Sequence, residues 1–485
     1  MAPIFTHPLS RVFSVSPCLR GEIQIPFQFG PNSQLSAMPS GAIDRSEKGW
    51  RSASSRPSLP EIHSSIPIPK SPVFLRKLVA FAGPGFLVAV GYMDPGNWAT
   101  DLAGGSKYNY TLLSVIMASN LMAILLQGLA IKLGVVTGRD LAQACREHFS
   151  RPVTIFFWVL AEIAIAACDL AEVIGSAIAL NLLFHIPLLL GVCLTALDVL
   201  LILFLQQKGF RFIEAIVVTL IGTIGICFGL EILFSRPSFM GIAQGFFIPS
   251  AQIIGDPGML YIAIGILGAT VMPHNLYLHS AIVQTRQFER TPEGKREAIR
   301  FCSIDSALAL TIALFVNAAI LIVSAATFYR HGFNQIAEIT DAYKLLTPLL
   351  GITGASTVFA LALLASGQNS TLTGTLAGQV VMEGFLDIRL RPWLRRLITR
   401  GIAILPAVVV TALWGTHGTA RLLVLSQVVL SMQLSFAVFP LVMFTSDRRK
   451  MGEFANRPWL KALSWVTAFL IAGLNVWLLV QVFRG

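Results

Sequence analysis

Long apolar segments alternate with short polar ones over most of the chain, and this pattern predicts transmembrane helices. A helix that crosses the hydrocarbon core of a bilayer needs about 20 mostly apolar residues. Eleven segments approach or exceed that length, at about residues 78–104, 110–136, 153–183, 187–206, 210–234, 258–285, 303–328, 343–367, 397–414, 421–445 and 459–483. Segment 368–387 is only moderately apolar, and we expect it to extend the eighth helix or to lie at the membrane surface. The pattern therefore predicts an all-α polytopic membrane protein with about 11 transmembrane helices.

The first 75 residues differ from the rest of the chain. They are rich in Ser and Pro, as in SAMPSG and RSASSRPSLP, and they show no sustained periodicity of apolar residues. A segment of this composition cannot bury enough apolar surface to offset the entropy of ordering. We therefore expect residues 1–75 to form a disordered cytoplasmic tail and residues 76–485 to form the transmembrane domain. Met38 is an alternative start of the chain.

The composition agrees with a membrane protein, and the distribution of basic residues predicts its orientation. Of the 485 residues, 54% are hydrophobic and 13% are charged, with a net charge of +11. If the N-terminus is cytoplasmic, twenty Lys and Arg residues fall in internal loops and six fall in external ones. Internal loops of membrane proteins carry such an excess. We expect a multi-pass protein of the cell (inner) membrane with a cytoplasmic N-terminus and an external C-terminus, without a nucleic-acid partner or an obligate protein partner.

Two tetrapeptides interrupt apolar segments at corresponding places in the two halves of the chain. They are Asp94-Pro95-Gly96-Asn97 and Met272-Pro273-His274-Asn275, and both have the form x-Pro-x-Asn. Proline breaks a helix because it lacks an N–H donor and clashes with the preceding turn. Paired interruptions of this kind point to a central binding site between two inverted repeats of a transporter. We expect two inverted five-helix repeats, 78–234 and 258–445, with broken helices 1 and 6, followed by an extra helix at 459–483.

The side chains at the two interruptions predict a transition-metal ion as the bound species. Asp94 offers a carboxylate, Asn97 a carbonyl oxygen and Met272 a thioether sulfur. A charged group at the centre of a span costs about 2.5–3.5 kcal/mol on insertion scales, so Asp94 needs a partner or a function. Sulfur is a poor ligand for Mg²⁺ and Ca²⁺ and a better one for softer metals. Unwound backbone near Gly91 and Ala269 can add carbonyl oxygens. A lone Met at such a position more often has a packing role, but the match of the two x-Pro-x-Asn motifs, one of them with Asp, favours a ligand role for Met272.

Three longer motifs resemble the signature segments of the Nramp family of proton-coupled divalent metal transporters. They are GYMDPGNWATDLAGG (91–105), ACDLAEVIGSAIALNLL (167–183) and GATVMPHNLYLHSAIVQTR (268–286). The resemblance covers about residues 75–485, and it is strongest to bacterial manganese transporters of the MntH type. It implies a LeuT-like (leucine-transporter-like) fold and import of Mn²⁺ or Fe²⁺ into the cytoplasm together with H⁺ by alternating access. Metal and protons are then the substrates, and no cofactor is expected.

The resemblance also implies roles for individual residues. Asp94, Asn97 and Met272 would bind the metal by side chain, and Gly91 and Ala269 would bind it through backbone carbonyls. Many members of the family have Ala where this chain has Gly91. Gln427 would complete the site in some states, with Gln433 as the alternative. The residues implied for the proton route are Asp94, Glu162, Asp169, Glu172, His274 and Arg400.

The titratable residues of the third span admit a second interpretation. Glu162, Asp169 and Glu172 are spaced so that they lie near one face of a helix. They could move protons, or they could form structural ion pairs, for which Arg400 in the ninth span is the expected partner. Both roles are compatible, because buried charges must be paired.

Three other functions are less compatible with the sequence. Relatives that carry Mg²⁺ or Al³⁺ typically lack the methionine at position 272. A membrane sensor would carry a large soluble output domain, which is not found after the last apolar segment. An enzyme would need a nucleophile beside a base, and no such arrangement is recognisable.

Overall fold

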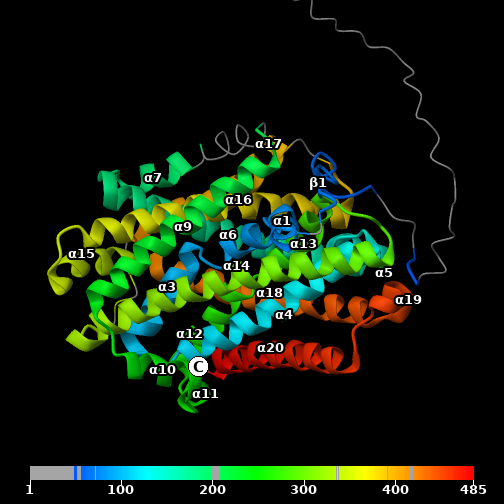
Figure 1. The fold of residues 1–485 in the computed structure, drawn as a ribbon. Coiled ribbons are helices and arrows are strands. Elements are labelled where there is room, and N and C mark those ends of the chain that lie inside the picture. Colours follow the sequence, from blue (N-terminus) through cyan, green and yellow to red (C-terminus); the bar gives the residue numbers. More distant parts are fainter. Residues whose placement is uncertain are drawn as a thin grey trace, which may run out of the picture. The chain divides into compact units, whose positions relative to one another are not determined.

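The apolar segments form long helices that pack side by side (Figure 1). The computed structural model describes residues 49–51, 56–71, 73–195, 197, 208–334, 336, 338–389, 392–414 and 419–484. Within this part, seven helices are long and apolar enough to cross a membrane, and a bent pair at Phe74–Phe81 and Pro84–Gly91 can make an eighth. The helices of the first half are α1 (Phe74–Phe81), α2 (Pro84–Gly91), α3 (Pro95–Tyr108), α4 (Leu113–Thr137), α5 (Leu141–His148), α6 (Arg151–Phe184), α7 (Leu188–Thr195) and α9 (Phe210–Ser235).

The first predicted span is broken twice. The expected break lies between α2 and α3, where residues 92–94 leave the helix just before Pro95. A second break, which the sequence analysis did not predict, bends α1 against α2 by 49°. It lies at Gly83, whose φ of 130° is open to glycine and strained for other residues. Pro84 follows and begins α2 at a position where a missing N–H costs little.

The second half contains the matching broken span and the remaining helices. The sixth predicted span is divided into α12 and α13 at Val271 and Met272. The elements of this half are α10 (Phe239–Phe247), α11 (Gln252–Gly255), α12 (Pro257–Thr270), α13 (Pro273–Ile282), η2 (Val283–Thr285), α14 (Pro292–Thr327), η3 (Tyr329–His331), α15 (Ile339–Leu350), α16 (Ala355–Leu386), α17 (Pro392–Trp414), α18 (Thr419–Ser446), α19 (Arg448–Met451), η5 (Gly452–Phe454) and α20 (Pro458–Arg484).

The eighth predicted span is divided between two helices in the structure. Residues 343–367 do not form one helix, because Gly351 and Gly354 adopt left-handed φ values and separate α15 from α16. Segment 368–387 continues α16, which was one of the two expected alternatives. Its polar residues are buried among helices that include α6, α9 and α13 rather than exposed on the outside of the bundle. Low hydropathy is therefore compatible with a central helix.

The structure also corrects the expected extent of the N-terminal tail. Residues 56–71 are placed, and Ile66–Pro67 (β1) forms a two-residue parallel pair with Arg286–Gln287 (β2). Within this segment Leu59 and Ile66 are buried, so it does bury some apolar surface. The rest of the tail lies largely outside the described residues, as does the second half of the fourth predicted span, 187–206.

Candidate metal-binding site

The break between α2 and α3 places Asp94 at the start of a half-helix. Asp94 is the N-cap residue of α3, with extended backbone, and Pro95 occupies the first helical position. The Asp94 carboxylate accepts a hydrogen bond of 2.8 Å from the backbone N–H of Asn97. A capping carboxylate satisfies one of the free N–H groups of the first turn. One residue thus serves both as a cap and as the single carboxylate within the break.

The break in the second half presents a thioether in the equivalent position. Met272 is the N-cap residue of α13, again with extended backbone and with Pro273 at the first helical position. Residues Ala269 and Thr270 form the last turn of α12, so their carbonyl groups lack the usual partners further along the helix. Both Asp94 and Met272 are buried completely.

Oxygen atoms from the two breaks converge on the amide group of Asn97. The Asn97 nitrogen Nδ2 donates to Asp94 Oδ1 at 2.7 Å, to the carbonyl oxygen of Ala269 at 3.1 Å and to that of Gly91 at 3.4 Å. Asn97 Oδ1 accepts from Asn317 Nδ2 of α14 at 3.3 Å. Three oxygen atoms from three helices therefore surround one electropositive group.

Gln427 and Met272 complete this cluster. Gln427 Nε2 of α18 donates to Asp94 Oδ2 at 3.3 Å, whereas the alternative, Gln433, lies further along α18. A Cβ atom at Gly91 would stand 3.1 Å from Met272 Sδ, which places the sulfur beside the Gly91 backbone. Met272 also belongs to a small apolar cluster with residues of α6 and α18. The structure thus brings all six predicted metal-site residues together.

Only some residues predicted for the proton route lie beside this cluster. His274 Nε2 lies 3.8 Å from Cys168 Sγ, and Cys168 Sγ lies 3.6 Å from Glu172 Oε1. Asp169 and Glu172 are buried on α6. A continuous line of polar contacts therefore runs from the second residue of α13 to the α6 carboxylates. The sequence analysis did not assign a role to Cys168, which is the middle member of that line.

Glu162 and Arg400 are placed differently. Glu162 lies earlier on α6, accepts a hydrogen bond from Trp158 Nε1 at 3.0 Å and lines an apolar cavity of about 230 Å³ that Ile402 of α17 also borders. Arg400 is part of α17, which packs against α6. The side chain of Arg400 lies outside the described residues, so its predicted pairing with Asp169 and Glu172 stays a prediction.

A buried chain of amide, phenol and imidazole groups joins the broken helices to α4. Gln127 Nε2 donates to Tyr92 Oη at 2.9 Å, and Gln127 Oε1 lies 2.9 Å from His279 Nδ1. Asn317 Nδ2 donates to the Tyr92 carbonyl at 2.7 Å. The sequence analysis missed Gln127 and Asn317. The sequence could have indicated both residues, because each is a polar residue inside a long apolar helix.

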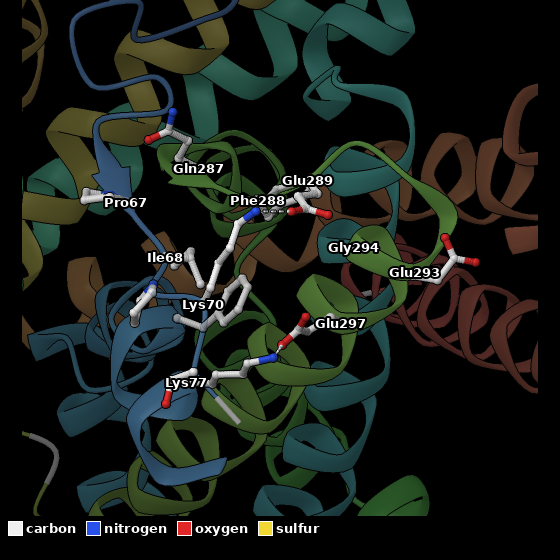
Figure 2. A pocket seen from close by; sticks show the side chains of 13 residues that line it. Pro67, Ile68, Lys70, Lys77, Gln287, Phe288, Glu289, Glu293, Gly294 and Glu297 are labelled. Carbon is white, nitrogen blue, oxygen red and sulfur yellow. Dashed lines mark hydrogen bonds and ion pairs between the residues drawn. The ribbon is translucent and has the colours of Figure 1, made fainter. Parts of the chain in front are cut away.

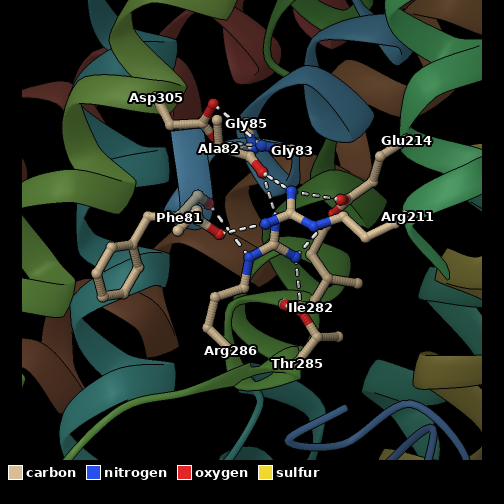
Figure 3. A network of polar contacts seen from close by, with 11 residues as sticks. Phe81, Ala82, Gly83, Gly85, Arg211, Glu214, Ile282, Thr285, Arg286 and Asp305 are labelled. Atoms are coloured by element: carbon tan, nitrogen blue, oxygen red, sulfur yellow. Dashed lines mark hydrogen bonds and ion pairs between the residues drawn. The ribbon is translucent and has the colours of Figure 1, made fainter. Parts of the chain in front are cut away.

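A second polar network holds the bend between α1 and α2 (Figure 3). The Arg286 guanidinium donates to the carbonyls of Phe81 and Ala82, and it forms an ion pair of 2.7 Å with Glu214 of α9. Asp305 of α14 accepts from the N–H groups at the start of α2, at 2.7 Å for Gly85. Arg286 and Asp305 thereby provide hydrogen bonds for the backbone C=O and N–H groups that lose their helical partners at the bend. Such groups need partners in apolar surroundings.

Comparison with known proteins agrees with this architecture. A model of the "Natural resistance-associated macrophage protein-like" (Nramp) family matches residues 85–481. The "Divalent metal cation transporter MntH" of Listeria innocua is 66% identical over 436 residues, which cover 90% of this chain and 97% of that protein. The protein of the same name from Nostoc is 66% identical over 430 residues, or 89% of this chain and 97% of that protein.

Solved structures agree as well. The crystal structure of the Eremococcus coleocola manganese transporter, in complex with an aromatic bis-isothiourea compound, has a TM-score of 0.81 and 44% identity, covering 86% of this chain and 90% of that one. MhsT in complex with L-phenylalanine has a TM-score of 0.57 at 14% identity, over 81% of this chain and 98% of that one, and it supports the LeuT-like fold alone. From the family match and these identities, the chain belongs to the Nramp family of membrane transporters.

Proposed function

We propose that this protein imports Mn²⁺ or Fe²⁺ into the cytoplasm together with protons, by alternating access. The metal would be held by the side chains of Asp94, Asn97 and Met272 and by the carbonyl oxygens of Gly91 and Ala269. Gln427 would contribute in some states of the cycle. The relatives named for divalent metal cation and manganese transport support this choice of substrate.

One observation carries the proposal: the oxygen atoms that surround Asn97 Nδ2. Asp94 Oδ1 and the carbonyls of Gly91 and Ala269 lie within 3.4 Å of one nitrogen atom and come from three separate helices. A set of oxygens that shares one partial positive charge is also suited to a cation. For a cation to take that place, the Asn97 amide would rotate and present its Oδ1 to the metal.

The thioether favours a transition metal over a harder cation. Met272 Sδ lies beside the Gly91 backbone, at the edge of the oxygen cluster. A sulfur ligand contributes little to Mg²⁺ or Ca²⁺ and more to Mn²⁺, Fe²⁺ and later metals. Transport of Mg²⁺ or Al³⁺, the alternative within the family, is therefore less compatible with this site.

We further propose a cytoplasmic N-terminus and an external C-terminus in the cell (inner) membrane. The excess of basic residues in the predicted internal loops supports this orientation. The end of the bundle that carries β1, β2, α5 and α19 would then face the cytoplasm. Two inverted repeats, 78–234 and 258–445, would place the broken spans on either side of the metal.

The proton route would leave the metal site through α6. The line His274–Cys168–Glu172 supports this direction, because it connects α13 with the buried carboxylates of α6. Asp169, Glu162 and Arg400 would continue the route or stabilise its charges.

Uptake by the purified protein in liposomes tests the proposal. Mn²⁺ uptake is measured with an imposed pH gradient and an internal pH dye, with Fe²⁺, Ca²⁺ or Mg²⁺ as competitors. We expect Fe²⁺ to compete, Ca²⁺ and Mg²⁺ to compete weakly, and the lumen to acidify as metal enters. Liposomes with Asp94→Ala protein serve as the control. Equal competition by Mg²⁺, or Mn²⁺ uptake without proton movement, would contradict the substrate or the coupling respectively.

A further inference from the structure

A short N-terminal segment crosses the end of the bundle that carries β1, β2, α5 and α19. We call its described residues, 49–51 and 56–67, the strap. At one attachment, β1 pairs with β2, and the backbone N–H of Ser64 donates to the carbonyl of Gln284 at 2.9 Å. These partners directly follow α13, the half-helix that begins at Met272. This attachment therefore belongs to the same chain segment as the metal site.

A second attachment joins the strap to α5 and α16. Ser58 Oγ donates to Asp140 Oδ2 at 2.7 Å, and the backbone N–H of Leu59 donates to Glu383 Oε2 at 2.9 Å. The side chain of Leu59 is 2% exposed. Both acceptors are buried carboxylates, so losing the strap would leave each of them without one of its donors.

A third attachment is centred on Trp50, which is 3% exposed. The Arg139 guanidinium lies 4.7 Å and the Lys450 ammonium 4.8 Å from the centroid of its ring, which also packs on Phe444 of α18. Lys450 Nζ also donates to the carbonyl of Gly49 at 2.7 Å. Cation–π contacts of this kind strengthen when the ring is desolvated.

The strap has little structure of its own. Its only regular element is the two-residue β1, and it holds to the helices through single hydrogen bonds and two buried apolar side chains besides Trp50. Just beyond it, Lys70 and Lys77 form ion pairs with Glu289 and Glu297, and all four residues line a cavity of about 730 Å³ (Figure 2). Because the strap contains no helix, it can detach without unfolding one.

The three attachments join the strap to different parts of the bundle. One holds the segment that follows α13, and the other two hold α5, α16, α18 and the residues next to them. The metal-site residues are enclosed, with Asp94, Asn97 and Met272 at most 1% exposed. An ion that leaves toward this end requires the broken half-helices to separate from the helices around them. We propose that the strap is a removable closure of the metal pathway at this end: it holds the closed state together and detaches when the pathway opens.

The proposal rests on the proposed function for the identity of the pathway, but its test does not depend on metal transport. Cys302 of α14 is 1% exposed and packs with Phe81 of α1 and Val283 of η2, so it reports separation of α1. Cys227 of α9 is also buried and lies in a different cluster, so it reports general unfolding. Alkylation of both native thiols by a small maleimide is followed by mass spectrometry in the full-length protein in liposomes.

We expect Trp50→Ala with Ser58→Ala to raise the alkylation rate of Cys302 by roughly tenfold, because both substitutions remove contacts that stabilise the closed state. The rate at Cys227 stays at the wild-type value. Lys70→Ala is the matched control, since its ion pair with Glu289 is exposed and contributes little. Deletion of residues 2–44, which precede the strap, is a second control with no expected effect. An unchanged alkylation rate at Cys302 overturns the proposal. An equal rise in the rate at Cys227 also overturns it, because the strap would then stabilise the whole fold and not the closed state alone.

A crosslink tests detachment in the opposite direction. Gln379 Nε2 of α16 donates to Glu61 Oε1 at 3.2 Å, so Glu61→Cys with Gln379→Cys can be bridged by a short, reducible bis-thiol reagent. We expect Mn²⁺ uptake to stop when the bridge forms and to return on reduction, whereas each single cysteine variant stays active. Undiminished uptake by fully bridged protein overturns the proposal. Asp94→Ala would instead lose uptake without a change in Cys302 alkylation, so failure of the metal site and failure of the strap are distinguishable.

Discussion

Asn97 Nδ2 lies 2.7 Å from Asp94 Oδ1 and 3.1 Å from the carbonyl oxygen of Ala269, and so one amide group links the two helix breaks. The two breaks are far apart in the sequence, because Asp94 lies in the first half of the chain and Met272 in the second. Their contact makes each break depend on the other, because neither set of unwound oxygens is satisfied by its own helix alone.

Asp94→Ala should abolish metal binding and leave the protein folded. Asp94 is the only carboxylate in either break, and a buried cation without its counter-charge loses roughly 3 kcal/mol or more. That loss corresponds to an affinity at least about a hundredfold weaker. Calorimetric titration of Mn²⁺ into the purified variant checks this, with the melting temperature as the test of folding. Near-normal affinity would exclude Asp94 as a ligand.

Met272→Ala should weaken discrimination between metals more than it weakens binding. Loss of the sulfur leaves a site made of oxygen donors, which Ca²⁺ and Mg²⁺ accept. The variant should also be less stable by about 2–5 kcal/mol, since Met272 is a buried side chain. Competition assays with excess Ca²⁺ measure the first effect. If excess Ca²⁺ still fails to compete with Mn²⁺, Met272 has a packing role only.

Gly96→Ala should separate Gln427 from Asp94. A Cβ atom at Gly96 would stand 1.6 Å from Gln427 Nε2, so the Gln427 side chain would have to move. We expect weaker metal binding, with the fold retained. Gly128→Ala in α4 is the matched control, because no atom lies within 4 Å of its Cβ position and alanine favours a helix by about 1 kcal/mol. Equal metal affinity in the two variants would show that Gln427 does not contribute to the site.

The residues predicted for the metal site lie together in the structure, whereas several of the predicted helix boundaries differ from it. Asp94 and Met272 stood out because a proline beside a ligand group is unusual inside an apolar segment. The bend at Gly83 was missed, because it depends on distant partners, Arg286 and Asp305, that satisfy the freed backbone groups. The start of α16 was missed for a different reason. Hydropathy does not report the left-handed φ values of Gly351 and Gly354, which separate α15 from α16 inside an apolar segment.

The N-terminal strap escaped prediction because its order is not local. Its composition favours disorder, and its bonds go to Asp140, Glu383 and Gln284, which are far away in sequence. The line through Cys168 escaped for the same reason, since His274 comes close to α6 only in the folded bundle.

Asp169→Asn and Glu172→Gln should reduce proton movement more than metal binding. Both residues lie on α6, outside the helix breaks, and each substitution keeps the shape while removing the titrating group. Internal pH and Mn²⁺ uptake are recorded in the same liposomes. Arg400→Ala should act in the same direction if Arg400 pairs with these carboxylates. Unaltered proton flux in both carboxylate variants would leave these residues as structural ion-pair partners.

Asp140, at the start of α5, should give the protein a pH-dependent stability. Burial raises the pKa of Asp140 from 3.8 to about 6, although hydrogen bonds from Ser58 and the backbone of Gln143 and the charge of Arg146 act in the opposite direction. The Asp140 carboxyl therefore binds a proton more tightly in the folded protein than in the unfolded chain. The resulting stabilisation is fully present below pH 3.8 and is lost as the pH rises through about 6. Its upper limit is about 3 kcal/mol, from 1.36 kcal/mol per pKa unit.

Asp140→Asn isolates this contribution, because asparagine also caps a helix and does not titrate. Melting temperatures of the wild-type protein and of the variant are compared between pH 4.5 and pH 7.5. Other carboxylates affect both proteins alike, so the difference between the two curves reports Asp140. We expect the wild-type protein to gain stability relative to the variant as the pH falls below about 6. Parallel curves over this range would mean that Asp140 has the same pKa in the folded and unfolded chains. That result would contradict the rise in pKa that its burial causes.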